Sequence, residues 1–111
     1  MSDLVLTDAS LRVLSVLYKE YKKRRKAGRR EQEARYFGDE NRIQSEFFPD
    51  DQADEIGNIC WYLHGKGLLC ASPGDDMANM VEFTDDGIAY MENWLARFVG
   101  KVFDVVKGVK G

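Results

Sequence analysis

The sequence is poor in cysteine and has no long uncharged apolar run. Cys60 and Cys70 are its only cysteines, too few for the disulfide framework of a small secreted protein. No window of about 18 uncharged apolar residues is present, because charged residues interrupt the most hydrophobic stretch near the C-terminus. The first residues lack the basic start and apolar core of a signal peptide. We therefore expect a cytoplasmic protein with no membrane span.

Recognisable catalytic motifs are also missing. The sequence has no glycine-rich phosphate loop, no Gly-x-Ser-x-Gly elbow and no His-Glu-x-x-His motif. Its single histidine, His64, stands one helical turn after Cys60, with Cys70 further on. A structural zinc site takes four ligands and usually paired cysteines, so we interpret these residues as two small thiols and a helix-end histidine. The expectation is a protein that is not an enzyme and has no metal and no cofactor.

An excess of positive charge is lacking as well, since the net charge is −3, which is not the balance of a protein that coats nucleic acid unaided. The charges are unevenly placed, with half of the basic residues in Lys19–Arg30. This basic run is the candidate contact for nucleic acid or an acidic partner, through Lys22, Lys23, Arg24, Arg25, Lys26, Arg29 and Arg30. The alternatives are a solvated helix end and pairing with the acidic segment 39–55.

What is present suits one folded domain spanning residues 1–111, because 44% of them are hydrophobic. A first helix should begin at Thr7 or Asp8, whose side chains can accept hydrogen bonds from free backbone N–H groups. Gly28 is its expected stop. Residues 29–34 could extend this helix or form a loop, and residues 35–37 could be a short strand. We expect core positions at Leu11, Ile56, Leu63 and Ile88.

The middle of the chain predicts two more helices and a hairpin. A second helix should begin at residues 39–40 and end before Pro49. Asp50 and Asp51 should form the turn and acidic cap of a third helix, which ends at residues 65–67. Within it, Gly57 is interpreted as a close-packing point between helices. Two short strands, 68–71 and 80–83, should flank a turn at residues 72–76.

Two local patterns resemble winged helix-turn-helix domains across about residues 7 to 92. Residues 59–69, Ile-Cys-Trp-Tyr-Leu-His-Gly-Lys-Gly-Leu-Leu, are similar to the end of that family's third helix and the Gly-Leu step after it. Residues 83–88, Phe-Thr-Asp-Asp-Gly-Ile, are like the Leu-Thr-x-x-Gly that follows the wing. The resemblance implies a mainly α fold with a small β-hairpin (α+β), a winged-helix core with an added long C-terminal helix. It also implies DNA binding by the third helix and the wing.

The exposed residues of those two elements depart from the DNA-binding pattern. The third helix presents Asp54 and Glu55 in its first turn, and the wing tip contains no lysine or arginine. Carboxylates at these places would repel the phosphate backbone, which DNA-binding proteins contact with cations. The first hypothesis is therefore a regulatory or assembly module that works through protein–protein contacts. The alternative is a DNA-binding regulator whose basic run, with Arg35, Arg42 or Lys66, contacts phosphate.

The last predicted helix, residues 85–108, carries apolar residues at alternating three- and four-residue steps. A core of this size covers only part of such a stripe, and an uncovered remainder marks an interface. It resembles the added helix through which some bacterial regulators dimerise. We predict a homodimer with an interface formed by Trp94, Phe98, Val102, Val105 and Val109. The alternatives are packing against the first helix and an interfacial membrane helix.

Overall fold

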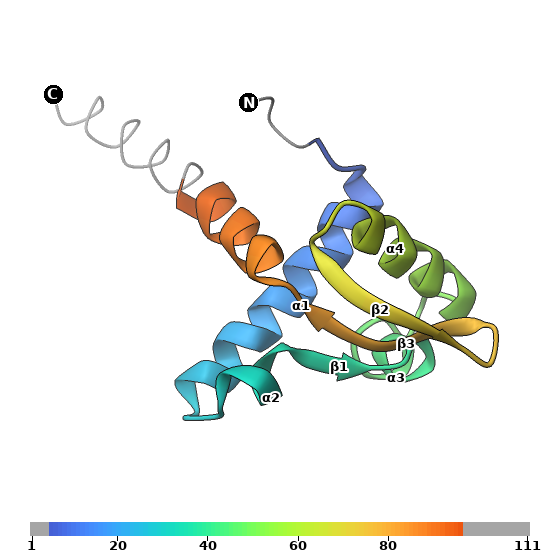
Figure 1. Ribbon diagram of the computed structural model, residues 1–111, viewed down its shortest axis with the longest axis horizontal. Helices are drawn as coiled ribbons and strands as arrows, with labels where there is room; N and C mark the ends of the chain where they lie inside the picture. Colours follow the sequence, from blue (N-terminus) through green and yellow to red (C-terminus); the bar gives the residue numbers. More distant parts are fainter. Residues whose placement is uncertain (1–4, 97–111) are drawn as a thin grey trace, which may run out of the picture.

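The computed structural model describes residues 5–96 and shows helices packed around a small antiparallel sheet (Figure 1). This confirms the predicted mainly α class with a small β-structure. A helix over residues 85–96, the C-terminal helix, follows the last strand. Phe98, Val102, Val105 and Val109 lie outside the described residues. The other elements are α1 Asp8–Lys26, α2 Glu31–Arg35, β1 Tyr36–Gly38, α3 Glu40–Phe47, α4 Ala53–Gly65, β2 Leu69–Gly74 and β3 Met77–Phe83.

The predicted start and stop of the first helix are confirmed. The Thr7 Oγ1 accepts a hydrogen bond from the Ser10 backbone N–H at 3.2 Å, which satisfies one of the free donors of the first turn. At the other end α1 stops at Lys26, and Gly28 adopts φ +87°, a conformation that favours glycine. Residues 31–35 form a separate short helix, and the strand expected at 35–37 is β1, one residue later.

The sheet has the strand order β1-β3-β2, with both pairs antiparallel. The predicted turn at 72–76 was too wide, because residues 72–74 continue β2 and pair with residues 77–79. Only Asp75 and Asp76 form the turn, with φ +50° and +58°. A two-residue hairpin loop needs positive φ at both residues to match the twist of the flanking strands. Pro73 fits within β2 because an edge strand has backbone N–H positions that need no partner.

The acidic cap predicted for the third helix was wrong. The residue that precedes α4 is Gln52, and its side chain makes no capping hydrogen bond. Asp51 instead forms an ion pair with Arg12 of α1, at 2.8 Å, so its carboxylate ties the α3–α4 turn to α1. The acids that do lie in the first turn of α4 are Asp54 and Glu55, where they complement the helix dipole.

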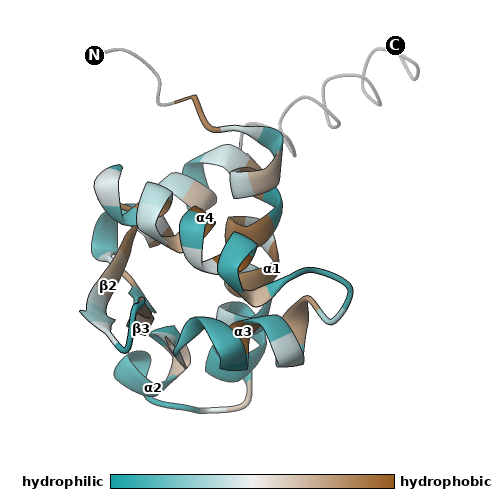
Figure 2. Ribbon diagram, turned by 90° about the vertical axis from the view of Figure 1, so that its right-hand side faces the viewer, coloured by the Kyte–Doolittle hydropathy of each residue, from teal (hydrophilic) through white to brown (hydrophobic). Residues whose placement is uncertain are grey.

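The core lies between α1, α4 and the sheet, and the hydrophobic positions of α1 and α4 face each other (Figure 2). Ile56, Leu63 and Ile88 are buried as predicted, and Leu11 is partly buried against the core. Gly87 lies in the first turn of the C-terminal helix, where the Thr84 Oγ1 accepts a hydrogen bond from its backbone N–H. Its Cα packs directly on the backbone carbonyl of Leu68, which leaves no room for a side chain. Ile88 and Met91 of that helix are buried in the same core cluster as residues of α1 and the sheet.

A polar network joins α1, α2 and the C-terminal helix. The Tyr21 hydroxyl donates a hydrogen bond to the Glu31 carboxylate at 2.7 Å, and Arg35 bridges Glu31 at 2.6 Å and Asp85 at 2.7 Å. Burial, followed by the hydrogen bond to Glu31, raises the pKa of Tyr21 to about 12. The hydrogen bond from Tyr21, with that from Arg35, lowers the pKa of Glu31. The network therefore favours a neutral phenol beside an ionised carboxylate.

Candidate functional site

The basic run divides into one structural arginine and a set of exposed cations. Arg24 is only 7% exposed. Its guanidinium bonds the Glu20 carboxylate at 2.8 Å and the Tyr36 carbonyl at 2.7 Å, and it lies over the Phe37 ring, 5.0 Å from the centroid. Arg24 was predicted as a contact for nucleic acid or an acidic partner, but its donors are committed inside the fold. Arg24 is therefore not available to contact a ligand.

Two alternatives were considered for the basic run, a solvated helix end and pairing with the acidic segment 39–55. Within residues 5–96, the ion pairs of this run go to Glu20 and Glu31, and none goes to the acidic segment 39–55. Arg25 reaches Glu31 at 3.3 Å and donates a hydrogen bond to the Arg29 carbonyl at 2.8 Å, so it is partly engaged at the helix end. The side chains of Arg29 and Arg30 are exposed.

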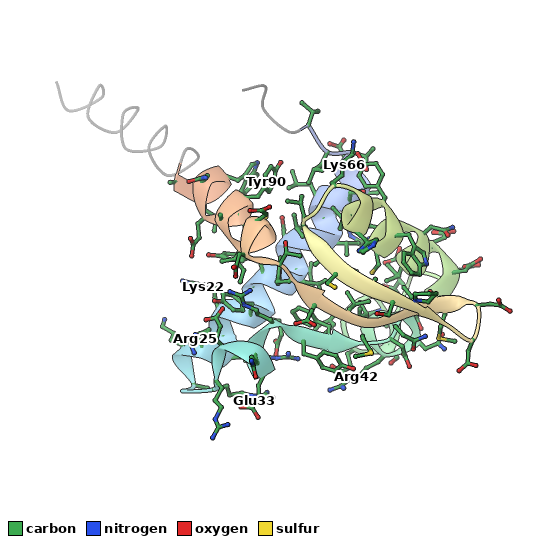
Figure 3. All side chains as sticks on the ribbon, in the orientation of Figure 1. Lys22, Arg25, Glu33, Arg42, Lys66 and Tyr90 are labelled. Atoms are coloured by element: carbon green, nitrogen blue, oxygen red, sulfur yellow. The ribbon has the colours of Figure 1, made fainter. Side chains whose placement is uncertain are left out.

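Four lysines form the lysine ridge, which consists of Lys19, Lys22, Lys23 and Lys26. Their spacing of three, four and seven residues places them on one face of α1, and all four are exposed. With Arg25 they line a shallow depression of about 640 Å³. In the described part of the chain none of the four forms an ion pair. Lys22 and Arg25 are seen on the outer side of α1 in Figure 3.

An apolar groove lies beside the ridge, between α1 and the C-terminal helix. It has a volume of about 340 Å³ and almost entirely apolar walls, formed by Ser15, Tyr18, Lys19, Lys22, Met91, Trp94 and Leu95. Its floor is well packed, since Tyr18 is 4% exposed and Met91 1%, whereas Leu95 on the rim is 36% exposed. Lys19 and Lys22 line both the groove and the ridge. We call this feature the α1 groove.

One residue of the predicted dimer interface lines the α1 groove. Trp94, the one predicted interface residue inside the described range, is partly buried against the core and lines the groove. At the start of the C-terminal helix, Ile88 and Met91 are buried in the core that α1 shares. Full packing of the apolar stripe against the first helix stays a prediction. Leu95, one turn after Met91, is 36% exposed and is therefore less covered by the core.

Acidic side chains gather at the other end of the fold. Asp54 and Glu55 of α4 and Asp75 and Asp76 of the hairpin turn are all exposed. The hairpin turn and the end of α1 that carries the ridge lie on opposite sides of the molecule (Figure 1). The basic run at the end of α1 and the acids of the hairpin turn are therefore separated in space, while Glu31 and Glu33 of α2 lie near the basic run.

The other cations considered for phosphate contact have partners within the fold. Arg35 pairs with Glu31 and Asp85, and Arg42 pairs with Glu46 at 3.0 Å. The Lys66 ammonium lies over the Tyr62 ring, 5.4 Å from its centroid. The ridge is thus the cationic surface with the fewest internal partners among these candidates.

The cysteines and the histidine are not brought together as a metal site. Cys60 is buried and Cys70 is exposed, and His64 makes an edge contact with the Trp61 ring. Burial raises the pKa of the Cys60 thiol to about 12, which keeps it protonated. Residues 5–96 contain no group of three or more His, Cys, Asp or Glu that could hold a metal ion.

Sequence reasoning missed the α1 groove, because it needs residues from two ends of the chain to meet. The ridge had a visible signal, since the four lysines follow helical spacing, but Lys19 was not singled out.

Comparison with protein-family models, with curated proteins and with solved structures found no match to this chain. In the described range no helix has the length and apolar character needed to cross a membrane.

Proposed function

We propose that the protein is a non-enzymatic winged-helix module that acts in regulation or assembly through protein–protein contacts, as a homodimer. Apart from the short helix α2 between α1 and β1, the elements follow the order helix, strand, helix, helix and hairpin, which supports the winged-helix interpretation. The pairing of the short strand β1 with the hairpin strand β3 supports it as well. The acidic surface of α4 and of the hairpin turn argues against the DNA contacts that such a fold usually makes with these elements. We further propose a cytoplasmic location, in keeping with two cysteines that are both free.

The observation that carries the homodimer is the α1 groove. Its walls are apolar and it opens to solvent, so covering it would remove apolar surface from water. A second copy is the occupant because the same apolar stripe continues in the sequence at the same spacing, from Met91 and Leu95 to Phe98 and Val102. A stripe that supplies both the groove and the side chains to fill it suits a two-fold symmetric interface.

Sedimentation velocity of the full chain tests this proposal. We expect a dimer in the micromolar range, and Leu95→Lys should shift it to monomer, because the new ammonium would stand beside Lys19 and Lys22 in a closed apolar contact. Val5→Lys is the matched control, since Val5 is 80% exposed and lies outside the groove; it should leave the dimer unchanged. A wild-type chain that remains monomeric at high micromolar concentration would overturn the homodimer.

A further inference from the structure

We propose that the lysine ridge binds the phosphate backbone of duplex nucleic acid, with no recognition of base sequence. The ridge lies on α1, which is neither the third helix nor the wing. This surface is distinct from the apolar contact proposed for the homodimer, although Lys19 and Lys22 border both.

The shape of the ridge suits a linear polyanion. Lys19 and Lys26 are seven residues apart on one helix face, which is about 10 Å at 1.5 Å per residue. Duplex DNA carries one negative charge per about 1.7 Å of its axis, so about six phosphate charges lie beside such a length. The lysines are exposed and need not break internal ion pairs in the described part of the chain before they can contact phosphate.

The ridge has no apolar anchor of its own, because the α1 groove beside it is assigned to the second copy. This favours nucleic acid over an acidic protein segment. The residues that line its depression are lysines and one arginine, with no apolar side chain among them. Protein segments gain most of their binding energy from buried anchors, whereas non-specific nucleic-acid binding comes almost entirely from cation–phosphate contacts. The acidic hairpin turn, on the far side of the molecule (Figure 1), stays away from a duplex seated on the ridge.

The proposed homodimer would strengthen this binding, and that part of the inference rests on the proposed function. Because Lys19 and Lys22 border the α1 groove, a second copy seated there would bring a second ridge beside the first. Two linked ridges on one duplex raise the affinity through effective concentration. A single ridge in a monomer still binds duplex, more weakly. An experiment can therefore overturn the proposed ridge binding without overturning the homodimer, and the reverse.

The test is fluorescence anisotropy of the full chain with labelled duplexes of two unrelated base sequences, over a series of salt concentrations. Both duplexes should bind equally, and log K should fall linearly with log salt, by about 0.9 for each phosphate contacted. Lys23→Gln/Lys26→Gln removes two contacts, at ridge lysines that do not line the α1 groove, and should reduce that slope by about 1.8. It should also weaken binding about tenfold or more at low salt.

Lys66→Gln is the matched control, because Lys66 is an exposed lysine at the end of α4 away from the ridge (Figure 3); it should bind as wild type. Sedimentation of the ridge variant should show the wild-type oligomeric state. No binding at low salt, or binding that the double variant leaves unchanged, would overturn the proposal. Tighter binding of polyglutamate than of duplex would assign the ridge to an acidic protein instead. A monomer that still binds duplex would overturn the homodimer alone.

Discussion

Gly57 of α4 packs directly against the carboxylate of Glu40 in α3, so that a Cβ at residue 57 would occupy the place of that carboxylate. The same carboxylate accepts a hydrogen bond from the backbone N–H of Ala78 at 2.8 Å. One acid at the start of α3 thus joins two helices and the hairpin, and it does so because residue 57 has no side chain. This confirms the sequence interpretation of Gly57 as a close-packing point.

Gly57→Ala should destabilise the protein although alanine is the better helix former. The gain in helix propensity is about 1 kcal/mol, but displacing Glu40 leaves the Ala78 N–H unsatisfied, which costs about 1–3 kcal/mol. Gly65→Ala is the matched control in the same helix, since a Cβ at Gly65 meets no atom within 4 Å. Urea unfolding should show a loss for the first variant and none for the second; equal stability of the two variants would contradict this packing.

Arg24 should contribute to stability and not to ligand binding. Arg24→Met removes the guanidinium that donates hydrogen bonds to the Tyr36 carbonyl and the Glu20 carboxylate. We expect the free energy of unfolding to fall by about 2–3 kcal/mol. Arg24→Lys should recover little, because a single ammonium cannot serve both partners and stack on Phe37. Lys23→Met, at the exposed neighbour, should change stability by less than about 0.5 kcal/mol. Thermal unfolding compares the three variants. An Arg24→Met variant as stable as wild type would contradict the structural role of Arg24.

The stability of the protein should fall at alkaline pH through Tyr21. Because the pKa of Tyr21 is raised to about 12 in the folded chain from an ordinary value of about 10, its contribution is complete below the ordinary value. It is lost as pH rises through the folded value. Tyr21→Phe should remove this part of the alkaline loss when free energies of unfolding are compared across pH. Tyr36→Phe, at an exposed tyrosine, should keep it.

Glu31 should produce the opposite dependence at acid pH. Its folded pKa lies below the ordinary value of about 4.3, so its contribution is present above that value. It is lost as pH falls through the lower folded pKa. Glu31→Gln should flatten the acid limb of the stability profile, whereas Glu33→Gln, an exposed neighbour on α2 (Figure 3), should leave it unchanged. Identical acid limbs for wild type and Glu31→Gln would contradict the network.

The hairpin turn should be improved by residues suited to positive φ. Asp75→Asn/Asp76→Gly places the favoured pair of a two-residue turn at φ +50° and +58° and should stabilise the protein by about 0.5–1 kcal/mol. Asp75→Ala should destabilise it by about 1 kcal/mol, because alanine disfavours the left-handed conformation. Denaturant unfolding measures both changes, and a loss of stability in the double variant would show that the aspartates have another role at this tip.

Local chemistry in the sequence was sufficient for both ends of α1, the start of α3 and much of the core. Thr7 and Asp39 cap helices, and Gly28 ends one, because capping depends on a few neighbouring atoms. The turn was drawn too wide because Pro73 suggests a loop, and only the edge position of β2 makes it compatible with a strand. Asp51 was assigned to α4 because its partner Arg12 lies 39 residues away, beyond any local pattern.

The basic run shows most clearly which properties each level decides. By itself the sequence determined that cations gather at the end of α1, since the charge and the helical spacing are local. Only the tertiary structure decided that Arg24 is buried, because the carbonyl that accepts its hydrogen bond returns to α1 with β1. It likewise decided that Lys19 and Lys22 border an apolar groove, because the other walls of that groove come from the C-terminal helix, more than 60 residues further along the chain.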